Sequence, residues 1–523
     1  MVWRCAGMKM MIKRWSSLLW AILLVGALVG CSTRVTAVPG SPTPTSTVSP
    51  SLTPTVEPTD IIPPATETPI PTPPPTPTPQ MELPQYQISA QLDYAALQVS
   101  VVETITIQNP AQQELASLSL AVPPNTSWWP NVFRLQDLSW QDGEKITEYS
   151  LEGVRLKIPI REAWFPGQSR DLTITYTLSL PEMNKVAGVG PSPFGYSRTK
   201  DNNLVKQINL VDWYPFLPPY QEGNGWIIHD PQVYGEYLVY PQADFDVSLQ
   251  ILNGPNDLVV AASSLDRGGE GSHRYQLEEA RNFVLSLSPY YQVLETGVNG
   301  TQVLGYHFPF YENAGGAAFQ TTVDALRLYA DLYAPYPQSS LTMVQADFDH
   351  GMEYEGLYFL NRSFFNGYND SPSSMLVAIA AHETAHQWWY GSVANDQALE
   401  PWLDEAICTY HEKIYLETYY PEAVAWWWDN RVNVYQPKGV IDRSIYETQS
   451  YLDYRDTTYL QGAHFMEDLR DTIGDEAFFS FLKAYAEAYA GKIATGDDFF
   501  NLLETYAEVD LRSLVDRYFQ DRP

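Results

Sequence analysis

The spacing of apolar residues changes along this chain, and this change constrains its fold more than any other feature. Before residue 300, apolar side chains recur at every second position in several segments, for example 86–92, 97–107, 172–178 and 245–251. This period is typical of antiparallel strands with one buried face. Helical spacing begins at residue 319, one strand is expected at 340–346, and from residue 371 the pattern is mostly helical to the C-terminus. The sequence therefore predicts a multidomain protein, with an all-β domain over residues 81–300 and a mainly α domain over 301–523.

The first 31 residues have the features of an export signal. Residues 1–14 contain four basic residues and no acidic one, and the apolar run 18–30 is short for a membrane span. The run ends in Leu-Val-Gly-Cys at 28–31, which resembles a bacterial lipobox. We therefore expect a lipoprotein signal peptide over 1–31 with Cys31 as the lipidation site, and an uncleaved signal anchor is the alternative. The resemblance implies an exported bacterial lipoprotein, anchored to the outer face of the cell membrane or in the cell envelope.

Residues 32–80 consist mostly of Pro, Thr and Ser. Such a segment cannot bury enough apolar surface to fold, so we expect a disordered tether. Pro-rich chains favour the polyproline II conformation, which rises ~3.1 Å per residue. At full extension the tether would hold the folded domains on the order of 150 Å from the membrane.

The charge of the chain excludes one large class of partners. The formal net charge is −31, from 62 acidic and 31 basic residues, whereas nucleic acids are bound through basic surfaces. The same charge disfavours adhesion to anionic lipid, so we expect membrane contact through the N-terminal lipid alone. The three cysteines form no disulfide framework, because two of them lie within the first 31 residues, and Cys408 is expected to be buried. The sequence gives no prediction of the oligomeric state.

The sequence His-Glu-Thr-Ala-His at 382–386 is the strongest candidate for a metal site. Ser371 is expected to cap the helix that carries it. Because residues four apart lie on one helix face, His382 and His386 would present two imidazoles to one ion. Glu383 lies about 100° further round the helix, where it would act as a general base instead of a ligand. A solvated helix face with two ordinary histidines is the alternative, although this spacing is rare by chance.

A catalytic zinc ion normally has three protein ligands and one open position. A third ligand in the pattern His-x-x-Gly-x-x-His is excluded, because positions 389 and 392 are Trp and Ser. The segment Trp-Leu-Asp-Glu-Ala at 402–406 offers Glu405 instead, after the eighteen residues 387–404. That length suffices to end one helix and to begin another antiparallel to it. We therefore predict one Zn²⁺ per chain, held by His382, His386 and Glu405, and consider Glu400 as a residue that orients one of the histidines.

These motifs resemble those of the gluzincin metallopeptidases of family M1, the aminopeptidase N type. The family has His-Glu-x-x-His, then a Glu after eighteen residues, and here Gln-Trp follows the second His. Gly351-Met352-Glu353 stands where the family has Gly-Ala-Met-Glu-Asn, and residues 459–463 match its Tyr-x-x-Gly-Ala. The resemblance covers roughly residues 85–520 and is strong over 340–480. It implies a saddle-like domain of antiparallel sheets followed by a thermolysin-like zinc peptidase domain.

The resemblance also implies roles for individual residues. Tyr459 would stabilise the oxyanion of a tetrahedral intermediate as a hydrogen-bond donor. Glu353 would bind the free α-amine of a peptide and so place the scissile bond one residue from the N-terminus. Gly351 and Met352 belong to the same substrate-binding motif, and Gly351 would allow a peptide to approach an edge strand closely. The expected activity is the removal of N-terminal residues from peptides at the cell surface, with Glu383 and Tyr459 as the catalytic residues.

The sequence departs from the family pattern in three places. Tyr354 replaces the family's Asn, the β-domain loop that supplies a second amine-binding residue is not recognisable, and the chain ends soon after the thermolysin-like part. We therefore expect a short form without the C-terminal helical domain and with an open cleft. Two alternatives follow. One is a surface zinc endopeptidase or oligopeptidase with Glu353 as an acidic subsite, and the other is a catalytically inactive, peptide-binding surface lipoprotein. Glu355 is expected to be either a second acid of the site or a solvated side chain.

Overall fold

The computed structural model describes residues 82–141, 143–183, 193–269, 271–348 and 351–520. The predicted signal peptide with Cys31 and the predicted tether lie outside these residues. The described residues belong to one compact unit. Among their helices, none combines the length and the apolar character that crossing a bilayer requires.

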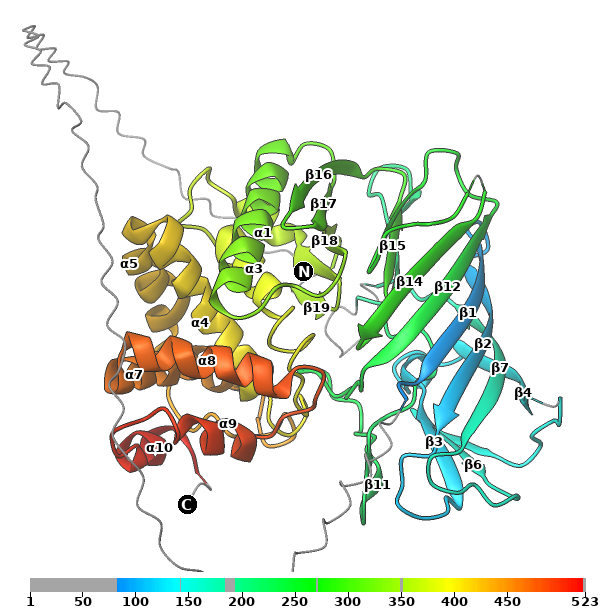
Figure 1. Cartoon of the computed structure of the whole chain (residues 1–523). Coiled ribbons are helices and arrows are strands. Elements are labelled where there is room, and N and C mark those ends of the chain that lie inside the picture. Colours follow the sequence, from blue (N-terminus) through cyan, green and yellow to red (C-terminus); the bar gives the residue numbers. More distant parts are fainter. Residues whose placement is uncertain (1–81, 142, 184–192, 270, 349–350, 521–523) are drawn as a thin grey trace, which may run out of the picture. The chain divides into compact units, whose positions relative to one another are not determined.

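A six-stranded sheet forms the framework of the β domain, in the order β14-β12-β1-β2-β7-β4 (Figure 1). Its strands are β1 (Gln85–Asp93), β2 (Gln98–Gln108), β4 (Phe133–Trp140), β7 (Ser169–Ser179), β12 (Ala243–Leu252) and β14 (His273–Ala280). The four segments with period two form β1, β2, β7 and β12, along which buried and more exposed residues alternate. Neighbouring strands are antiparallel except β1 and β12, which run parallel.

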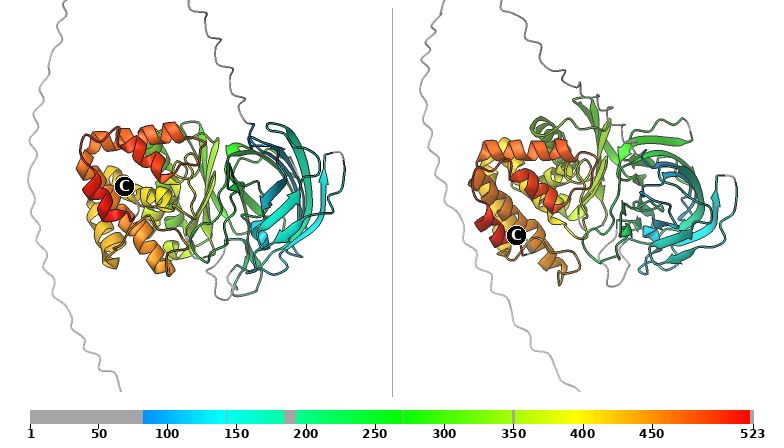
Figure 2. Two further views of the ribbon diagram at one scale, coloured as in Figure 1. Left: turned by 90° about the horizontal axis from the view of Figure 1, so that it is seen from below. Right: turned by 60° about the horizontal axis from the view of Figure 1, so that its bottom comes forward.

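Smaller sheets complete the β domain around a common interior (Figure 2). One contains β13 (Val259–Ala262), β15 (Leu285–Ser288), β9 (Val205–Leu210) and β8 (Gly195–Arg198), another β3 (Ser117–Ala121), β6 (Arg155–Pro159) and β5 (Ser150–Glu152), and the last β10 (Tyr220–Gln221) and β11 (Gly225–Trp226). A 3₁₀ turn, Pro123–Asn125, follows β3. Fully buried aromatic side chains such as Trp164 and Trp213 fill the interior.

The second domain begins with strands. Its five-stranded sheet has the order β16-β17-β18-β20-β19, from β16 (Gln292–Val298), β17 (Thr301–His307), β18 (Ser340–Ala346), β20 (Leu357–Asn361) and β19 (Met352–Tyr354). The strand predicted at 340–346 is therefore confirmed. By sheet membership β16 belongs to the second domain although it precedes the predicted boundary at residue 301. The period of two marks strands in either domain, so it does not reveal where one domain ends.

The central strands β18 and β20 of the five-stranded sheet are buried at every position, because both faces of the sheet are covered there. Along β18, Val344 and Ala346 pack into the core of the β domain, whereas Leu341 and Met343 pack against the helices. The helices on that face are α1 (Glu312–Leu332) and α3 (Met375–Ala385) (Figure 1). Strand β19 forms one edge of the sheet.

Helices make up most of the remaining chain, as the sequence predicted. They are α2 (Arg362–Gly367), α4 (Trp402–Tyr419), α5 (Val424–Trp426), α6 (Tyr451–Tyr454), α7 (Gly462–Ile473), α8 (Asp475–Tyr489), α9 (Gly496–Leu503) and α10 (Arg512–Tyr518). Two π-helical segments, Trp427–Val432 and Arg455–Gln461, and two 3₁₀ turns, Pro421–Ala423 and Asn433–Tyr435, connect them. The order of a β domain and a mainly helical peptidase domain is therefore confirmed.

The cap of α3 differs from the prediction. Ser374 is the N-cap, with extended backbone angles, and its side chain accepts a hydrogen bond from the backbone N–H of Val377. The side chain of Ser371 instead accepts from the backbone N–H of Ser373, within the preceding turn. Both serines precede the apolar run, and only the turn geometry distinguishes them.

One buried carboxyl group in the β domain lacks a well-formed hydrogen bond from the described residues. Glu103 on β2 is fully buried, and neither of its carboxyl oxygens accepts a hydrogen bond of normal geometry from a described residue. Burial raises the pKa of Glu103 well above its ordinary value, and the neighbouring Tyr176 offsets this only in part. The folded protein therefore favours the protonated form of Glu103 more than the unfolded chain does.

We predict that Glu103→Leu stabilises the protein. The expected gain is about 1–3 kcal/mol in the free energy of unfolding, the usual cost of an unsatisfied buried polar group. Because the folded pKa exceeds the unfolded one, the wild type loses stability as the pH rises above the ordinary Glu value. The gain, measured by urea unfolding, should therefore be larger near pH 8 than near pH 5. Glu103→Gln is the control that removes the titration but keeps the polarity, and an equal gain at both pH values would contradict the prediction.

Candidate metal centre and active site

Helix α3 brings the two histidines together. Residues 376–385 are all buried, and His382 and His386 lie one turn apart with their Nε2 atoms separated by 3.1 Å. Glu405 reaches the same point from the first turn of α4, with Oε2 at 3.1 Å from Nε2 of His382 and 3.6 Å from Nε2 of His386. The structure therefore places the three predicted metal ligands in one cluster.

The geometry of this cluster fits a zinc ion. Tetrahedral ligands with bonds of 2.0–2.1 Å lie about 3.3 Å from one another, close to the three separations between His382, His386 and Glu405. Two imidazoles and one carboxylate are also a donor set that zinc prefers in catalytic sites. Nδ1 of His386 lies 3.1 Å from the carbonyl oxygen of Trp389, which only accepts hydrogen bonds, so Nδ1 carries the proton and Nε2 offers its lone pair.

A buried carboxylate orients the other histidine. Oε1 of Glu412 lies 3.2 Å from Nδ1 of His382, and Arg431 and Trp427 donate hydrogen bonds to Glu412. Burial alone would raise the pKa of Glu412, but Arg431 and His382 hold it below its ordinary value. Glu400 does not have the role considered for it, because its carboxylate accepts from the backbone N–H of Gly496. The sequence contained a signal for Glu412, which lies on α4 two turns after Glu405.

Glu383 lies against the segment that precedes β19. It is 4% exposed, and a Cβ atom at Gly351 would stand 2.0 Å from its Oε1. Glycine at position 351 thus leaves room for the carboxylate, a role that the sequence did not suggest. Burial raises the pKa of Glu383 to about 8, partly offset by His382 and His386. A divalent cation on the three ligands favours the ionised form, which is the form a general base needs.

Tyr459 also lies beside the metal ligands. It belongs to the π-helical segment Arg455–Gln461, and such segments are frequent at functional sites. Its hydroxyl donates a hydrogen bond of 2.5 Å to Oε1 of Glu405, and its ring stacks on that of His382 with centroids 6.0 Å apart. The hydroxyl is therefore held next to the position that the ligand geometry gives to the metal.

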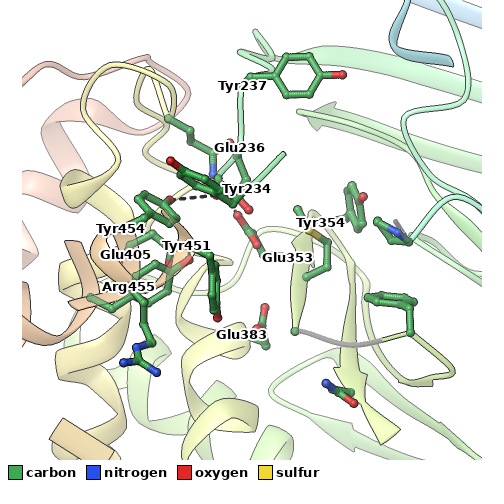
Figure 3. A pocket seen from close by; sticks show the side chains of 18 of the residues that line it. Tyr234, Glu236, Tyr237, Glu353, Tyr354, Glu383, Glu405, Tyr451, Tyr454 and Arg455 are labelled. Carbon is green, nitrogen blue, oxygen red and sulfur yellow. Dashed lines mark hydrogen bonds between the residues drawn. The ribbon is translucent and has the colours of Figure 1, made fainter. Parts of the chain in front are cut away.

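A second acidic group adjoins the metal cluster. Glu353 on the edge strand β19 is 5% exposed, and Glu236, which precedes β12 in the β domain, approaches it (Figure 3). One oxygen each of Glu236, Glu353 and Glu405 lies within 4.8 Å of the others. Burial and then the neighbouring acids raise the pKa of Glu236 well above its ordinary value, and burial likewise raises that of Glu353. The sequence missed Glu236, because its only signal is an acid within an aromatic segment.

Hydrogen bonds hold the two acids in place. The amide of Gln397 donates to Oε1 of Glu353 and to Oδ2 of Asp404. The hydroxyl of Tyr454 donates to Oε2 of Glu236, as the dashed line in Figure 3 shows. The carboxylates are therefore fixed relative to the metal ligands before any ligand arrives.

A cavity of about 740 Å³ connects these groups. Its wall includes Glu236, Glu353, Glu383, Glu405 and Tyr459, together with Gly351 and Met352 of the predicted substrate-binding motif. Aromatic and apolar side chains from both domains form most of the rest, and they include Trp128, Trp129, Phe194, Tyr234, Tyr237, Phe348, Phe364, Met375, Ile379, Tyr435, Tyr451 and Tyr454. This volume is in the range of pockets that bind small ligands, and the wall combines apolar surface with acidic groups.

Comparisons with known proteins agree with this arrangement. Residues 317–518 match the Peptidase family M1 domain. The chain is 28% identical over 231 residues to aminopeptidase M1-D of Oryza sativa subsp. japonica and 27% identical over 226 residues to aminopeptidase N of Lactococcus lactis subsp. lactis. These matches cover 41% and 40% of this chain but 26% and 27% of the relatives. The chain thus spans about a quarter of the length of the curated relatives it matches.

Solved structures share the fold of both domains. An M1 zinc metallopeptidase from Deinococcus radiodurans has a TM-score of 0.60 at 17% identity, covering 85% of this chain and 96% of that one. A mutant of that metallopeptidase bound to a Tyr-Ser-Ala substrate has a TM-score of 0.57 at 18% identity, covering 84% and 95%. At this level of identity the similarity establishes the fold.

The chain thus combines the two-domain fold of an M1 zinc metallopeptidase with a cluster of candidate metal ligands. Its residues 317–518 match the peptidase family M1 domain, so the family resemblance that the sequence predicted is confirmed. That family implies a zinc cofactor, which the ligand cluster fits.

We predict that Glu412→Gln weakens zinc binding by roughly 10–100-fold, because the residue behind a metal-binding imidazole sets its orientation and basicity. The measurement is competition with a chelator of known zinc affinity, on protein whose circular dichroism shows it folded. Glu417→Gln is the matched control on the same helix, since Glu417 pairs with Lys413 and Arg470 instead. Equal affinities of the Glu412 variant and the wild type would refute the role of Glu412.

Proposed function

We propose that this protein is a zinc aminopeptidase that removes N-terminal residues from peptides at the cell surface. The observation that carries the proposal is the pair Glu236 and Glu353 beside the three metal ligands. Two carboxylates whose oxygens lie within 4.8 Å of each other repel each other when both are ionised, and a bound cation relieves this cost. A peptide α-amine is such a cation, and both carboxylates can accept its hydrogen bonds.

The position of the amine determines which bond is cleaved. With the α-amine at Glu353 and Glu236, an extended substrate reaches the metal ligands with its first carbonyl group. The aromatic wall of the cavity then contacts the side chains of the substrate. This geometry therefore exposes the first peptide bond of the substrate to attack.

The groups around that carbonyl have separate roles in the proposed reaction. When bound, zinc supplies Lewis-acid polarisation of the carbonyl and a lowered pKa of the attacking water. Glu383 accepts a proton from that water and passes it to the leaving amine. The Tyr459 hydroxyl donates a hydrogen bond to the oxygen on which negative charge develops.

The test compares one short peptide with its N-acetylated twin. Acetylation removes the charge that Glu236 and Glu353 recognise, so we predict that the wild type cleaves only the free peptide, at its first bond. Glu353→Ala should lower kcat/KM for the free peptide on the order of a hundredfold, because a buried charged contact is lost. Products are identified by mass spectrometry.

Controls separate this proposal from its rivals. Glu383→Gln should bind zinc but cleave neither peptide, which excludes a contaminating peptidase. Cleavage of both twins at similar rates would instead indicate the zinc endopeptidase. A zinc-loaded wild type that cleaves neither peptide would favour the inactive peptide-binding lipoprotein.

The location at the cell surface rests on the N-terminal sequence. The basic head, the apolar run and Cys31 support export and lipidation. We predict that cells expressing the full chain incorporate a labelled fatty acid into it and that Cys31→Ser abolishes the label. Cys5→Ser is the matched control, because Cys5 precedes the apolar run. Retention of the label in the Cys31 variant would contradict lipidation at this residue.

A further inference from the structure

A fully buried arginine of the β domain contacts the peptidase domain close to the metal ligands. Arg281 lies between β14 and β15 and is 1% exposed. Its side chain donates to carbonyl oxygens: Nε to Gly391 at 3.0 Å, and Nη2 to Ser392 and Lys492 at 3.0 Å each. A guanidinium group presents its donors in a rigid, planar fork, so it fixes these carbonyl groups relative to one another.

The segment that Arg281 holds follows directly after the metal-binding motif. The backbone N–H of Gly391 donates to the carbonyl of His386 at 2.9 Å, and the carbonyl of Trp389 faces Nδ1 of His386 at 3.1 Å. Between them, Tyr390 has a φ angle of +138°, which a residue with a side chain rarely adopts. Such a conformation persists only when the surroundings impose it.

The next residue of the β domain holds Tyr390 itself. The side-chain amide of Asn282 donates to the hydroxyl of Tyr390, and its oxygen accepts from the backbone N–H of Glu355 at 3.2 Å. Glu355 is buried, and one of its oxygens accepts from the backbone N–H of Arg281 at 2.7 Å. It is therefore neither a second acid of the cavity wall nor a solvated side chain.

We propose that Arg281 is a positioning residue for His386. Its side chain fixes the carbonyl groups of residues 391 and 392. These fixed carbonyl groups keep the strained Tyr390 in place. The Trp389 carbonyl therefore stays directed at Nδ1 of His386. The proposal rests on the proposed function, which takes His386 as a zinc ligand. It adds that a residue of the β domain holds this ligand in position. Among the described residues, the Arg281 side chain donates its hydrogen bonds to carbonyl oxygens and not to Glu353, so its loss should affect the metal side of the site more than amine binding.

The experiment measures zinc release from the folded full chain into a chelator, in the absence of peptide. Arg281→Met keeps the apolar stem and removes every donor, and we expect release at least about tenfold faster than in the wild type. Arg281→Lys keeps the charge but has a single donor centre, and should also release zinc faster. For both variants kcat should fall with little change in KM.

Lys206→Met is the matched control. It removes a partly buried cation between the domains: Lys206 on β9 pairs with Asp347, which follows β18 and also pairs with Arg362. Faster release from the Arg281 variants than from Lys206→Met, at a temperature where circular dichroism shows all of them folded, supports the proposal.

Release at the wild-type rate from both Arg281 variants overturns the proposal, as does an equally fast release from Lys206→Met. If Arg281→Met does not fold, Arg281→Lys decides. Because release is measured without substrate, a protein that binds zinc but cleaves no peptide would refute the proposed function alone, and the release rates would still decide the role of Arg281.

Discussion

The candidate site depends on a helix that is almost completely buried. Helix α3 packs between the five-stranded sheet and α4, and its residues 376–385 are all buried. Yet the helix carries His382, Glu383 and His386, whose polar atoms would be costly to bury alone. The neighbouring elements must therefore supply partners for these atoms, and much of the remaining structure around the site can be understood from this requirement.

The partners come from several parts of the chain. Glu405 and Glu412 come from α4, Arg431 from the π-helical segment behind it, and Tyr459 from a second such segment. The loop after the helix supplies the Trp389 carbonyl, which faces Nδ1 of His386. Because these groups contact one another as well as the histidines, the arrangement of charges is fixed before a cation binds, which lowers the reorganisation that binding requires.

Some features of the fold and of the site could be predicted from the sequence, because they depend on residues that are close together in the chain. The period of two along β1 and β2 and the spacing of His382 and His386 are properties of single elements, so they appear directly in the sequence. Glu236 and Arg281 became part of the site only through contacts between domains, which no local pattern encodes. Glu412 is an intermediate case, because its helical spacing from Glu405 was visible but its partner His382 was not. The cap of α3 shows the same limit on a small scale, since Ser371 and Ser374 differ only in turn geometry.

The acidic pair has a further consequence, because its members belong to different domains. Glu236 precedes β12 in the β domain, and Glu353 lies on β19 of the peptidase domain. Neither domain alone contains both. The pair exists only while the domains are docked, and a cation that binds both carboxylates binds the docked state alone. By thermodynamic linkage, binding of such a ligand stabilises the docked state of the two domains. This stabilisation equals the free energy by which docking increases the affinity for the ligand. Cation binding at the acidic pair and docking of the two domains are in this sense coupled equilibria.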